Sequence, residues 1–258
     1  METKKQGVGS VARALQLLQL LAAQNSGGVR FTDLCEMAGL SQGTAHRLLR
    51  TLIEANFVEQ NYVSRRYHLG SAFLELGTVA GNQENLQETA EPRLRELALV
   101  TGDTVFMVIR SGLDSLCIAR VDGSNTVKAL TMSVGARRPL GYGAGALTLL
   151  SFSPDAERKD LIRRLSYRVN RYSELHPDRL QPAIEEVRRQ GFAYIEGTIL
   201  KAMATISVPL LDSNDTIVAA ISVAATIRRM SEPRRSAIRT LAQQTAKQIL
   251  EESRQLSR

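Results

Sequence analysis

The stretch FTDLCEMAGLSQGTAHRLLRTLIEANFVEQNYVSRRYHL, from Phe31 to Leu69, predicts two short helices around a tight turn, followed by a β-hairpin. We expect the first helix to begin at Thr32, whose hydroxyl can cap it, and to end at Gly39 in the left-handed conformation. Ser41 is expected to cap the second helix. Helical spacing then gathers the apolar residues of the second helix on one side and leaves the other side polar and basic.

After Asn56 the pattern changes from helical spacing to alternation, which predicts a hairpin with two arginines near its tip. A hairpin directly behind such a helix is typical of a winged helix, in which the helix enters the major groove and basic residues of the wing meet phosphate or a narrow minor groove. Helix-turn-helix segments also occur as packing units in all-helical domains, but the wing and the basic helix face together favour DNA binding. The candidate DNA-binding residues are Ser41, Gln42, Thr44, His46, Arg47, Arg50, Arg65 and Arg66.

The composition bounds the remaining possibilities. A chain of 258 residues with a formal charge of +7 is long enough for two cores, and its basic excess is spread over both halves. Its two cysteines, Cys35 and Cys117, stand far apart in apolar contexts, so neither a disulfide framework nor a cysteine metal site is expected. The apolar runs at 15–23 and 144–152 are too short to span a bilayer and no charged leader precedes them, so we expect a cytoplasmic protein without a membrane partner.

The sequence indicates three parts. Residues 1–70 form the winged helix-turn-helix domain, which begins with a helix at 10–23 and includes a short strand at 29–31 that pairs with the wing. Residues 71–99 are linker helices, with a break at Gly81 and Asn82 and with Pro92 in the first turn of the second helix. Apolar residues at 73–79 are expected to contribute to a dimer interface.

Residues 100–258 predict one α+β domain for effector binding and oligomerisation, with a sheet flanked by helices. The first three strands form an antiparallel meander, and a glycine-rich loop follows them. Turn residues and helical spacing place strands at 104–110, 116–121, 126–132, 192–195, 204–211 and 216–225, and helices at 155–165, 177–190 and 232–256.

The glycine-rich run GYGAGAL, from Gly141 to Leu147, matches neither a P-loop nor a dinucleotide fingerprint. Two interpretations stay open: backbone amides that approach an anionic ligand, or a tightly packed loop. No catalytic set emerges, because His46 and His68 lie in the DNA-binding module and His176 lies in a polar loop. No catalytic residue, metal site or cofactor is therefore predicted.

Five motifs in order make the chain resemble the IclR family of bacterial transcriptional regulators along nearly its whole length. They are SVARALQLLQLLA at 10–22, LSQGTAHRLLRTL at 40–52, RYHLGSAFLELG at 66–77, VGARRPLGYGAGALTLL at 134–150 and VPLLDSNDTIVAAISVAA at 208–225. The resemblance implies a winged-helix domain and a GAF-like or PAS-like effector domain that binds a small organic acid from a catabolic pathway. It also implies homodimers or homotetramers on double-stranded DNA with a palindromic operator.

In such regulators the glycine-rich loop and the last strands line the effector pocket. The resemblance therefore implies the effector-binding residues Leu140, Gly141, Tyr142, Gly143, Ala144, Gly145, Met203, Thr205, Ser207, Ser222 and Ala224.

The chain departs from the pattern of the family at several pocket positions. Gly141 and Leu147 stand where members often carry His and Lys, Ala202 and Thr205 stand where Gly and Cys are common, and Ile195 replaces an acidic residue of some members. The pocket is thus expected to be less polar than the pattern suggests. We expect an effector with an apolar or aromatic body, whose anionic end meets backbone amides at 143–145 and the hydroxyls of Thr205, Ser207 or Ser222.

Two functions follow from the sequence. The first is a ligand-responsive transcription factor, in which effector binding changes the spacing of two winged helices and hence operator affinity. The alternative is an enzyme or small-molecule-binding module with an accessory helical domain.

Overall fold

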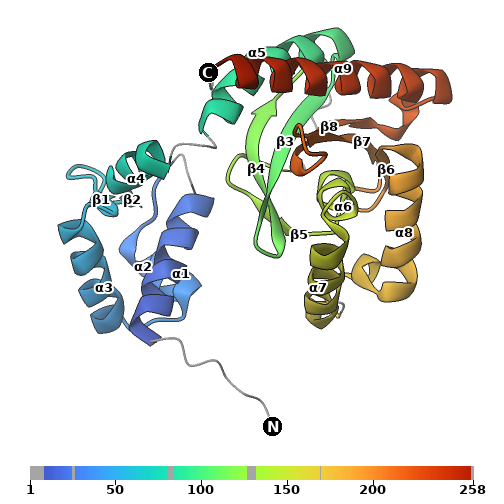
Figure 1. Ribbon diagram of the computed structural model, residues 1–258. Helices are drawn as coiled ribbons and strands as arrows, with labels where there is room; N and C mark the ends of the chain where they lie inside the picture. Colours follow the sequence, from blue (N-terminus) through green and yellow to red (C-terminus); the bar gives the residue numbers. More distant parts are fainter. Residues whose placement is uncertain (1–8, 25–26, 81–83, 127–131, 169, 257–258) are drawn as a thin grey trace. The chain divides into compact units, whose positions relative to one another are not determined.

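A computed structural model describes residues 9–24, 27–80, 84–126, 132–168 and 170–256, and the chain divides into two compact units at Met1–Glu84 and Asn85–Arg258 (Figure 1). The expected break at Gly81 and Asn82 and most of the expected strand at 126–132 lie outside the described residues. None of the helices in the described part is long and apolar enough to cross a membrane.

The first unit is a winged helix-turn-helix, as expected. Its elements are α1 (Gly9–Ala23), α2 (Phe31–Ala38), α3 (Gln42–Glu54), β1 (Val58–Gln60), β2 (Tyr67–Leu69) and α4 (Ala72–Ala80). The two strands pair antiparallel, and Val29 adds a single bridge to Tyr67, which confirms the short pairing segment before α2. Leu17, Leu34 and Leu49, one from each of the first three helices, are fully buried in the core.

The turn between α2 and α3 is confirmed, but the two side-chain caps are wrong. Gly39 has a φ of 63°, and its N–H donates to the carbonyl of Glu36. The first helix begins at Phe31 rather than Thr32, and the Thr32 hydroxyl donates to the Asp33 carboxylate. Ser41 does stand at the start of α3, but its hydroxyl donates to Thr44 Oγ1 at 3.0 Å, so side-chain pairing replaces the cap.

The second unit contains a six-stranded antiparallel sheet in the order β5-β4-β3-β8-β7-β6. The strands are β3 (Thr104–Ser111), β4 (Asp114–Val121), β5 (Arg137–Pro139), β6 (Ala193–Glu196), β7 (Met203–Leu211) and β8 (Ile217–Thr226). Strand β5 lies within the segment expected to be a loop. Strand β3 pairs with β8 on one side, so the first and last strands of this unit lie at the centre of the sheet.

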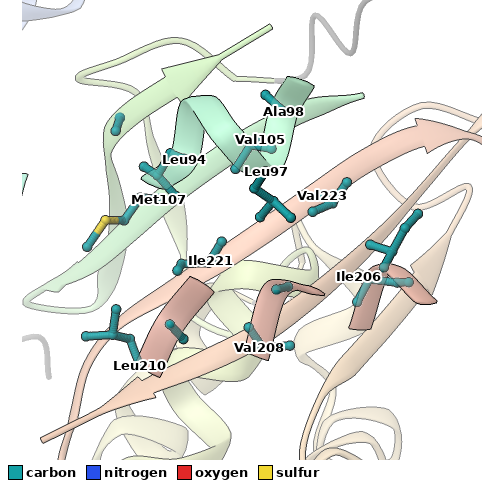
Figure 2. Close-up of a cluster of buried hydrophobic side chains, with 14 of the residues drawn as sticks. Leu94, Leu97, Ala98, Val105, Met107, Ile206, Val208, Leu210, Ile221 and Val223 are labelled. Atoms are coloured by element: carbon teal, nitrogen blue, oxygen red, sulfur yellow. The ribbon is translucent and has the colours of Figure 1, made fainter. Parts of the chain in front are cut away.

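Helices cover both faces of this sheet, which confirms the α+β class (Figure 1). The helices are α5 (Glu84–Thr101), α6 (Ala144–Ser151), α7 (Asp155–Leu165), α8 (Pro177–Gln190) and α9 (Glu232–Leu256), with 3₁₀ turns at Ser166–Arg168, Ser173–Leu175 and Ile227–Arg229. Alternate residues of β3 face opposite layers, because Met107 packs with α5 and α9 whereas Val108 packs with α6 and α8. Figure 2 shows the first of these layers, with Leu94 and Leu97 of α5 against Val105, Met107 and Val223.

The segment expected to be a linker is divided between the two units. Helix α4 belongs to the first unit, where Phe73 packs edge-to-face on Phe57 with ring centroids 5.2 Å apart. Helix α5 packs on the sheet of the second unit. The prediction that Pro92 opens this helix is wrong, because α5 begins at Glu84 and Pro92 lies inside it on the exposed side. Burial of Leu94 and Leu97 against the sheet stabilises the helix despite the lost backbone donor.

Candidate DNA-binding surface and effector pocket

Helix α3 presents the predicted polar residues on one face. Ala45 and Leu49 are buried against the rest of the first unit, and the half-buried Leu48 packs against the same core. Gln42, His46, Arg47 and Arg50 are exposed, and Thr44 is half-buried. The structure therefore brings the helix residues of the candidate DNA-binding set together on a single surface.

The side chains of this surface differ in how firmly they are held. Arg50 Nε lies 2.8 Å from Glu54 Oε1 in an exposed ion pair one helical turn away. His46 packs edge-on against Phe31, with ring centroids 6.3 Å apart. The guanidinium of Arg47 makes no side-chain hydrogen bond or ion pair within the described residues, so it is available to a base edge.

The wing has a tightly built tip. Asn61 Oδ1 accepts hydrogen bonds from the backbone N–H groups of Val63 and Ser64, at 3.0 and 2.9 Å. Arg65 then adopts the left-handed conformation with a φ of 57°, and its carbonyl accepts from the Gln60 side-chain amide at 3.0 Å. These bonds fix the turn and leave the Arg65 side chain exposed.

The second arginine of the wing has a different environment. Arg66 Nη1 donates to the carbonyl oxygens of Gly28 and Gly27, at 2.8 and 3.3 Å. This guanidinium therefore ties the wing to the segment that precedes α2. The sequence predicts the same role for Arg65 and Arg66. The hairpin geometry distinguishes them, because only Arg66 donates to the carbonyls of Gly27 and Gly28.

The second unit contains a pocket between the sheet, the start of α6 and the β6–β7 connection. Its empty volume is about 570 Å³, open solvent at the mouth included. The lining residues are Phe106, Val108, Ser115, Met132, Arg138, Tyr142, Gly143, Ala144, Gly145, Ala146, Ile195, Thr198, Ile199, Leu200, Met203, Thr205 and Ser222.

Seven of the eleven predicted effector residues are in this lining, and four are not. The four that lie outside it are Leu140, Gly141, Ser207 and Ala224. Leu140 and Ala224 are buried in the core next to the pocket. A Cβ on Gly141 would lie 2.8 Å from Leu180, so this glycine allows the loop to approach α8.

The floor of the pocket is narrow and carries a hydroxyl group. A Cβ on Gly145 would lie 2.9 Å from Val108 Cγ2 and 3.0 Å from Ser222 Oγ, so the absence of a side chain there brings α6 close to the sheet. The Ser222 hydroxyl donates to Ser207 Oγ at 3.0 Å. Ser207 thus contacts Ser222, and of these two serines it is Ser222 that lines the pocket.

The β6–β7 connection forms one wall of the pocket, and sequence reasoning missed it. Thr198, Ile199 and Leu200 line this wall. The Tyr142 hydroxyl donates to the carbonyl of Thr198 at 3.4 Å, and the Tyr142 ring packs against Tyr172 at 4.6 Å between centroids. Tyr142 therefore links the connection to the glycine-rich loop, and Tyr172 packs against the ring of Tyr142.

Arg138 is the second feature that sequence reasoning missed. This residue is in β5 opposite Ser115, and a Cβ on Gly143 would lie 3.8 Å from its Nη1. Burial lowers the pKa of the Arg138 guanidinium, and the nearby Tyr142 raises it. An arginine keeps its charge in proteins even so, and the pocket therefore holds a cation. Alternation along β5 was the signal that could have identified it, since Arg137 is exposed and Arg138 is not.

The titratable groups offer no catalytic set. Burial raises the pKa of the Cys117 thiol to about 11, so this cysteine is neutral at ordinary pH. His176 Nδ1 accepts from the backbone N–H of Asp178 at the start of α8, and His46 and His68 belong to the first unit. Within the described residues, no group of three or more His, Cys, Asp or Glu side chains could hold a metal ion.

A winged helix-turn-helix followed by an α+β unit with its own pocket defines a ligand-responsive DNA-binding regulator. Two family models assign it further: the one described as the IclR helix-turn-helix domain matches residues 10–61, and the one described as the bacterial transcriptional regulator IclR C-terminal matches residues 79–251. The chain belongs to the IclR family of bacterial transcriptional regulators. The proteins of this family regulate transcription, so the alternative of an enzyme with an accessory helical domain does not hold.

Curated relatives match along most of their length. The chain is 26% identical to the transcriptional repressor IclR of Escherichia coli over 94% of this chain and 89% of the repressor. It is 29% identical to the glycerol operon regulatory protein of Streptomyces coelicolor, over 86% and 87%. An IclR regulator structure from Alicyclobacillus acidocaldarius superposes with a TM-score of 0.76 at 22% identity, covering 96% of this chain and 99% of that one.

One further structure was solved with a ligand. An IclR homolog from Microbacterium hydrocarbonoxydans in complex with 4-hydroxybenzoate has a TM-score of 0.76 and 20% identity, with 95% of this chain and 99% of that chain covered. At this identity the likeness establishes a shared fold.

Proposed function

We propose that this protein is a cytoplasmic regulator of catabolic genes. It binds its operator through α3 and the wing, and it responds to a small organic acid that binds in the second unit. The observation that carries the proposal is the pocket itself, which combines largely apolar walls with a cation and the hydroxyls of Thr205 and Ser222. Such a lining suits a small molecule with an apolar body and few polar groups. The 4-hydroxybenzoate bound by the Microbacterium homolog is a molecule of this kind.

We further propose that the protein acts as a homodimer, or as a homotetramer of two such dimers, on a palindromic operator. Leu74 and Leu76, two residues apart within one turn of α4, are 71% and 55% exposed, which is a large exposure for apolar side chains. Pairing α4 with its copy would cover these side chains and hold two α3 helices about one DNA turn apart. Sedimentation of the full-length protein distinguishes the dimer from the tetramer.

The test of this function has two steps. Sequencing the DNA that the purified protein binds gives the operator, and electrophoretic shift of that operator with and without 4-hydroxybenzoate measures the response. We expect one dominant two-fold symmetric motif, and we expect the acid to change its affinity. The proposal would be contradicted if the purified protein shifted neither the DNA upstream of its own gene nor any other DNA.

Arg47 is expected to read a base. Because its guanidinium makes no side-chain hydrogen bond or ion pair in the described part of the chain, Arg47→Ala should weaken operator binding by about 1 to 3 kcal/mol without loss of stability. Arg163→Ala is the matched control, since Arg163 is an exposed arginine of α7 in the other unit. Shift titrations on the operator and on unrelated DNA measure the effect, and equal weakening on both would instead mean a phosphate contact.

The two wing arginines are expected to act differently when each is replaced by alanine. Arg65→Ala should reduce the dependence of affinity on salt by about one unit of slope, as expected for a lost phosphate contact, without lowering stability. Arg66→Ala should destabilise the first unit by about 1 kcal/mol or more, because it frees two backbone carbonyls. Thermal melts and salt titrations separate the two effects, and identical behaviour would contradict this assignment.

A further inference from the structure

We propose that Tyr62 and Val63, at the tip of the wing, enter the minor groove of the operator next to the bases read by α3 and favour A·T over G·C base pairs there. This inference rests on the proposed DNA-binding function and adds to it the residues of a second contact and the groove that receives them. The sequence predicted wing contacts for the charged Arg65 and Arg66, and the structure places two exposed apolar side chains just before them in the loop.

Tyr62 and Val63 are the most exposed large apolar residues in the described part of the chain, at 92% and 94%. The tips of tight loops usually carry Gly, Asn, Asp, Ser or Pro, because these residues suit the backbone of a turn. Within the described residues the Tyr62 ring pairs with no other aromatic ring, and its hydroxyl makes no hydrogen bond. Folding of the first unit therefore gains little from either side chain, and a partner outside the chain is needed to remove them from water.

The loop that carries these two side chains is held in one shape by hydrogen bonds. The Asn61 N–H donates to the Arg66 carbonyl, and the Arg65 N–H donates to the Asn61 carbonyl, both at 2.9 Å. The Asn61 side chain also accepts from the N–H groups of Val63 and Ser64. The tip is therefore preorganised, and its apolar side chains lose little further freedom when they meet a partner.

The charge around the tip favours a partner that is anionic at its rim. Residues 61–66 include two arginines and no carboxylate. The Arg65 side chain is exposed and makes no hydrogen bond or ion pair within the described residues, and the closest acidic residue along the chain, Glu59, lies in β1 before the loop. A DNA minor groove has this character, because phosphates line its rims and its interior accepts apolar side chains. An apolar protein surface would leave Arg65 without an anion.

The chemistry of the minor groove explains the preference for A·T pairs. Only residues 55–57 separate α3 from β1, so the wing meets the groove beside the one that α3 occupies. The minor groove is about 6 Å wide, and its floor distinguishes base pairs by the N2 amino group of guanine. That amino group keeps an apolar side chain away from the floor of a G·C pair, whereas A·T pairs leave the floor open. The Tyr62 hydroxyl can also donate to the acceptors that A·T pairs present there.

Shift titrations of the full-length protein on an operator with modified bases test this contact. In the probe, 2,6-diaminopurine replaces adenine in the base pairs that flank the two half-sites. This base adds an N2 amino group to the minor groove and leaves the hydrogen-bonding groups of the major groove in place. We expect the affinity of the wild-type protein to fall about 10-fold on this DNA. Inosine in place of guanine removes the amino group and should not weaken binding.

The double variant Tyr62→Ala, Val63→Ala should bind the unmodified operator about 10- to 100-fold more weakly and should no longer respond to diaminopurine. Tyr167→Ala is the matched control, since Tyr167 is 87% exposed in the second unit, and it should leave both properties unchanged. Thermal melts of these variants should match the wild type, because the replaced side chains are exposed. Tyr62→Phe keeps the ring and should keep the preference for A·T pairs.

The outcomes separate this inference from the proposed function. Operator affinity unchanged in the double variant would overturn the inference and leave the regulator function standing. A response to diaminopurine that is absent in the wild type, or retained in the double variant, would do the same, as would an operator whose flanks contain only G·C pairs. If the wild-type protein shifted no DNA, the inference and the proposed function would both fail.

Discussion

Replacing Gly70 by alanine is expected to abolish operator binding while the second unit stays folded. A Cβ at this position would lie 2.1 Å from the carbonyl oxygen of Asn56 and 3.0 Å from the backbone nitrogen of Val58. Both neighbours are backbone atoms, so no side-chain rotation can relieve the overlap. The N–H of Gly70 also donates to the Phe57 carbonyl at 2.9 Å, and that bond closes the base of the wing between the end of β2 and the residue before β1.

The overlap is expected to cost the first unit about 3 kcal/mol or more, because a backbone shift must break the wing pairing. Shift assays with the operator and thermal melts followed by circular dichroism measure the two consequences. Gly9→Ala is the control, since a Cβ at this residue of α1 meets nothing within 4 Å and alanine favours the helix. An alanine variant at Gly70 with wild-type operator affinity would show that the wing is not required for binding.

Helical spacing predicted the helices whose ends are marked by capping or turn residues. The helices at 155–165, 177–190 and 232–256 have the expected bounds, and Gly191 ends α8 with a φ of 80°. Helical spacing and turn residues act over a few positions, so one sequence suffices to place them. The predicted cap at Thr32 is wrong because α2 begins one residue earlier, with Arg30 at the N-cap, and at Ser41 the hydroxyl is directed to the Thr44 side chain instead.

The order of the strands in the sheet could not be predicted from the sequence, because it depends on pairing between distant segments. The contact of β3 with β8 joins segments more than a hundred residues apart, and no turn signal announces it. Strand β5 has only three residues, two of them arginines, and it forms because β4 offers an edge to pair with. The sequence of this segment therefore predicts a loop rather than a strand.

The candidate site residues likewise divide into those predicted from local pattern and those that depend on long-range pairing. The outer face of α3 follows from helical spacing, whereas the pocket residues on the glycine-rich loop and the last strands came from family resemblance. Arg138 and the wall at Thr198, Ile199 and Leu200 were missed because both depend on how the sheet pairs. The unequal environments of Arg65 and Arg66 likewise depend on the contact of the wing with Gly27 and Gly28.

Asp103→Ala is expected to destabilise the second unit strongly while it leaves the pocket lining intact. The Asp103 side chain is 1% exposed, and its two oxygens accept from Arg229 Nε at 3.0 Å and from Arg234 Nη2 at 2.6 Å. Both arginines also donate to the carbonyl of Thr101, at 3.3 and 2.7 Å. This cluster joins the end of α5 to the 3₁₀ turn at Ile227–Arg229 and to the start of α9, which lies on the same face of the sheet as α5.

Removing the carboxylate leaves two partly buried guanidinium groups beside each other without their anion. Loss of one partner of a buried ion pair costs about 3 to 5 kcal/mol, and we expect the lower part of that range because the arginine side chains are 38% and 27% exposed. Denaturant unfolding without ligand measures it, and Asp160→Ala, which removes an exposed carboxylate, should cost less than about 1 kcal/mol. Because the cluster lies wholly within the second unit, the melting of the first unit should not change. If both transitions moved together, the two units would have to unfold as one, and the wing variants would then report on the stability of the pocket as well.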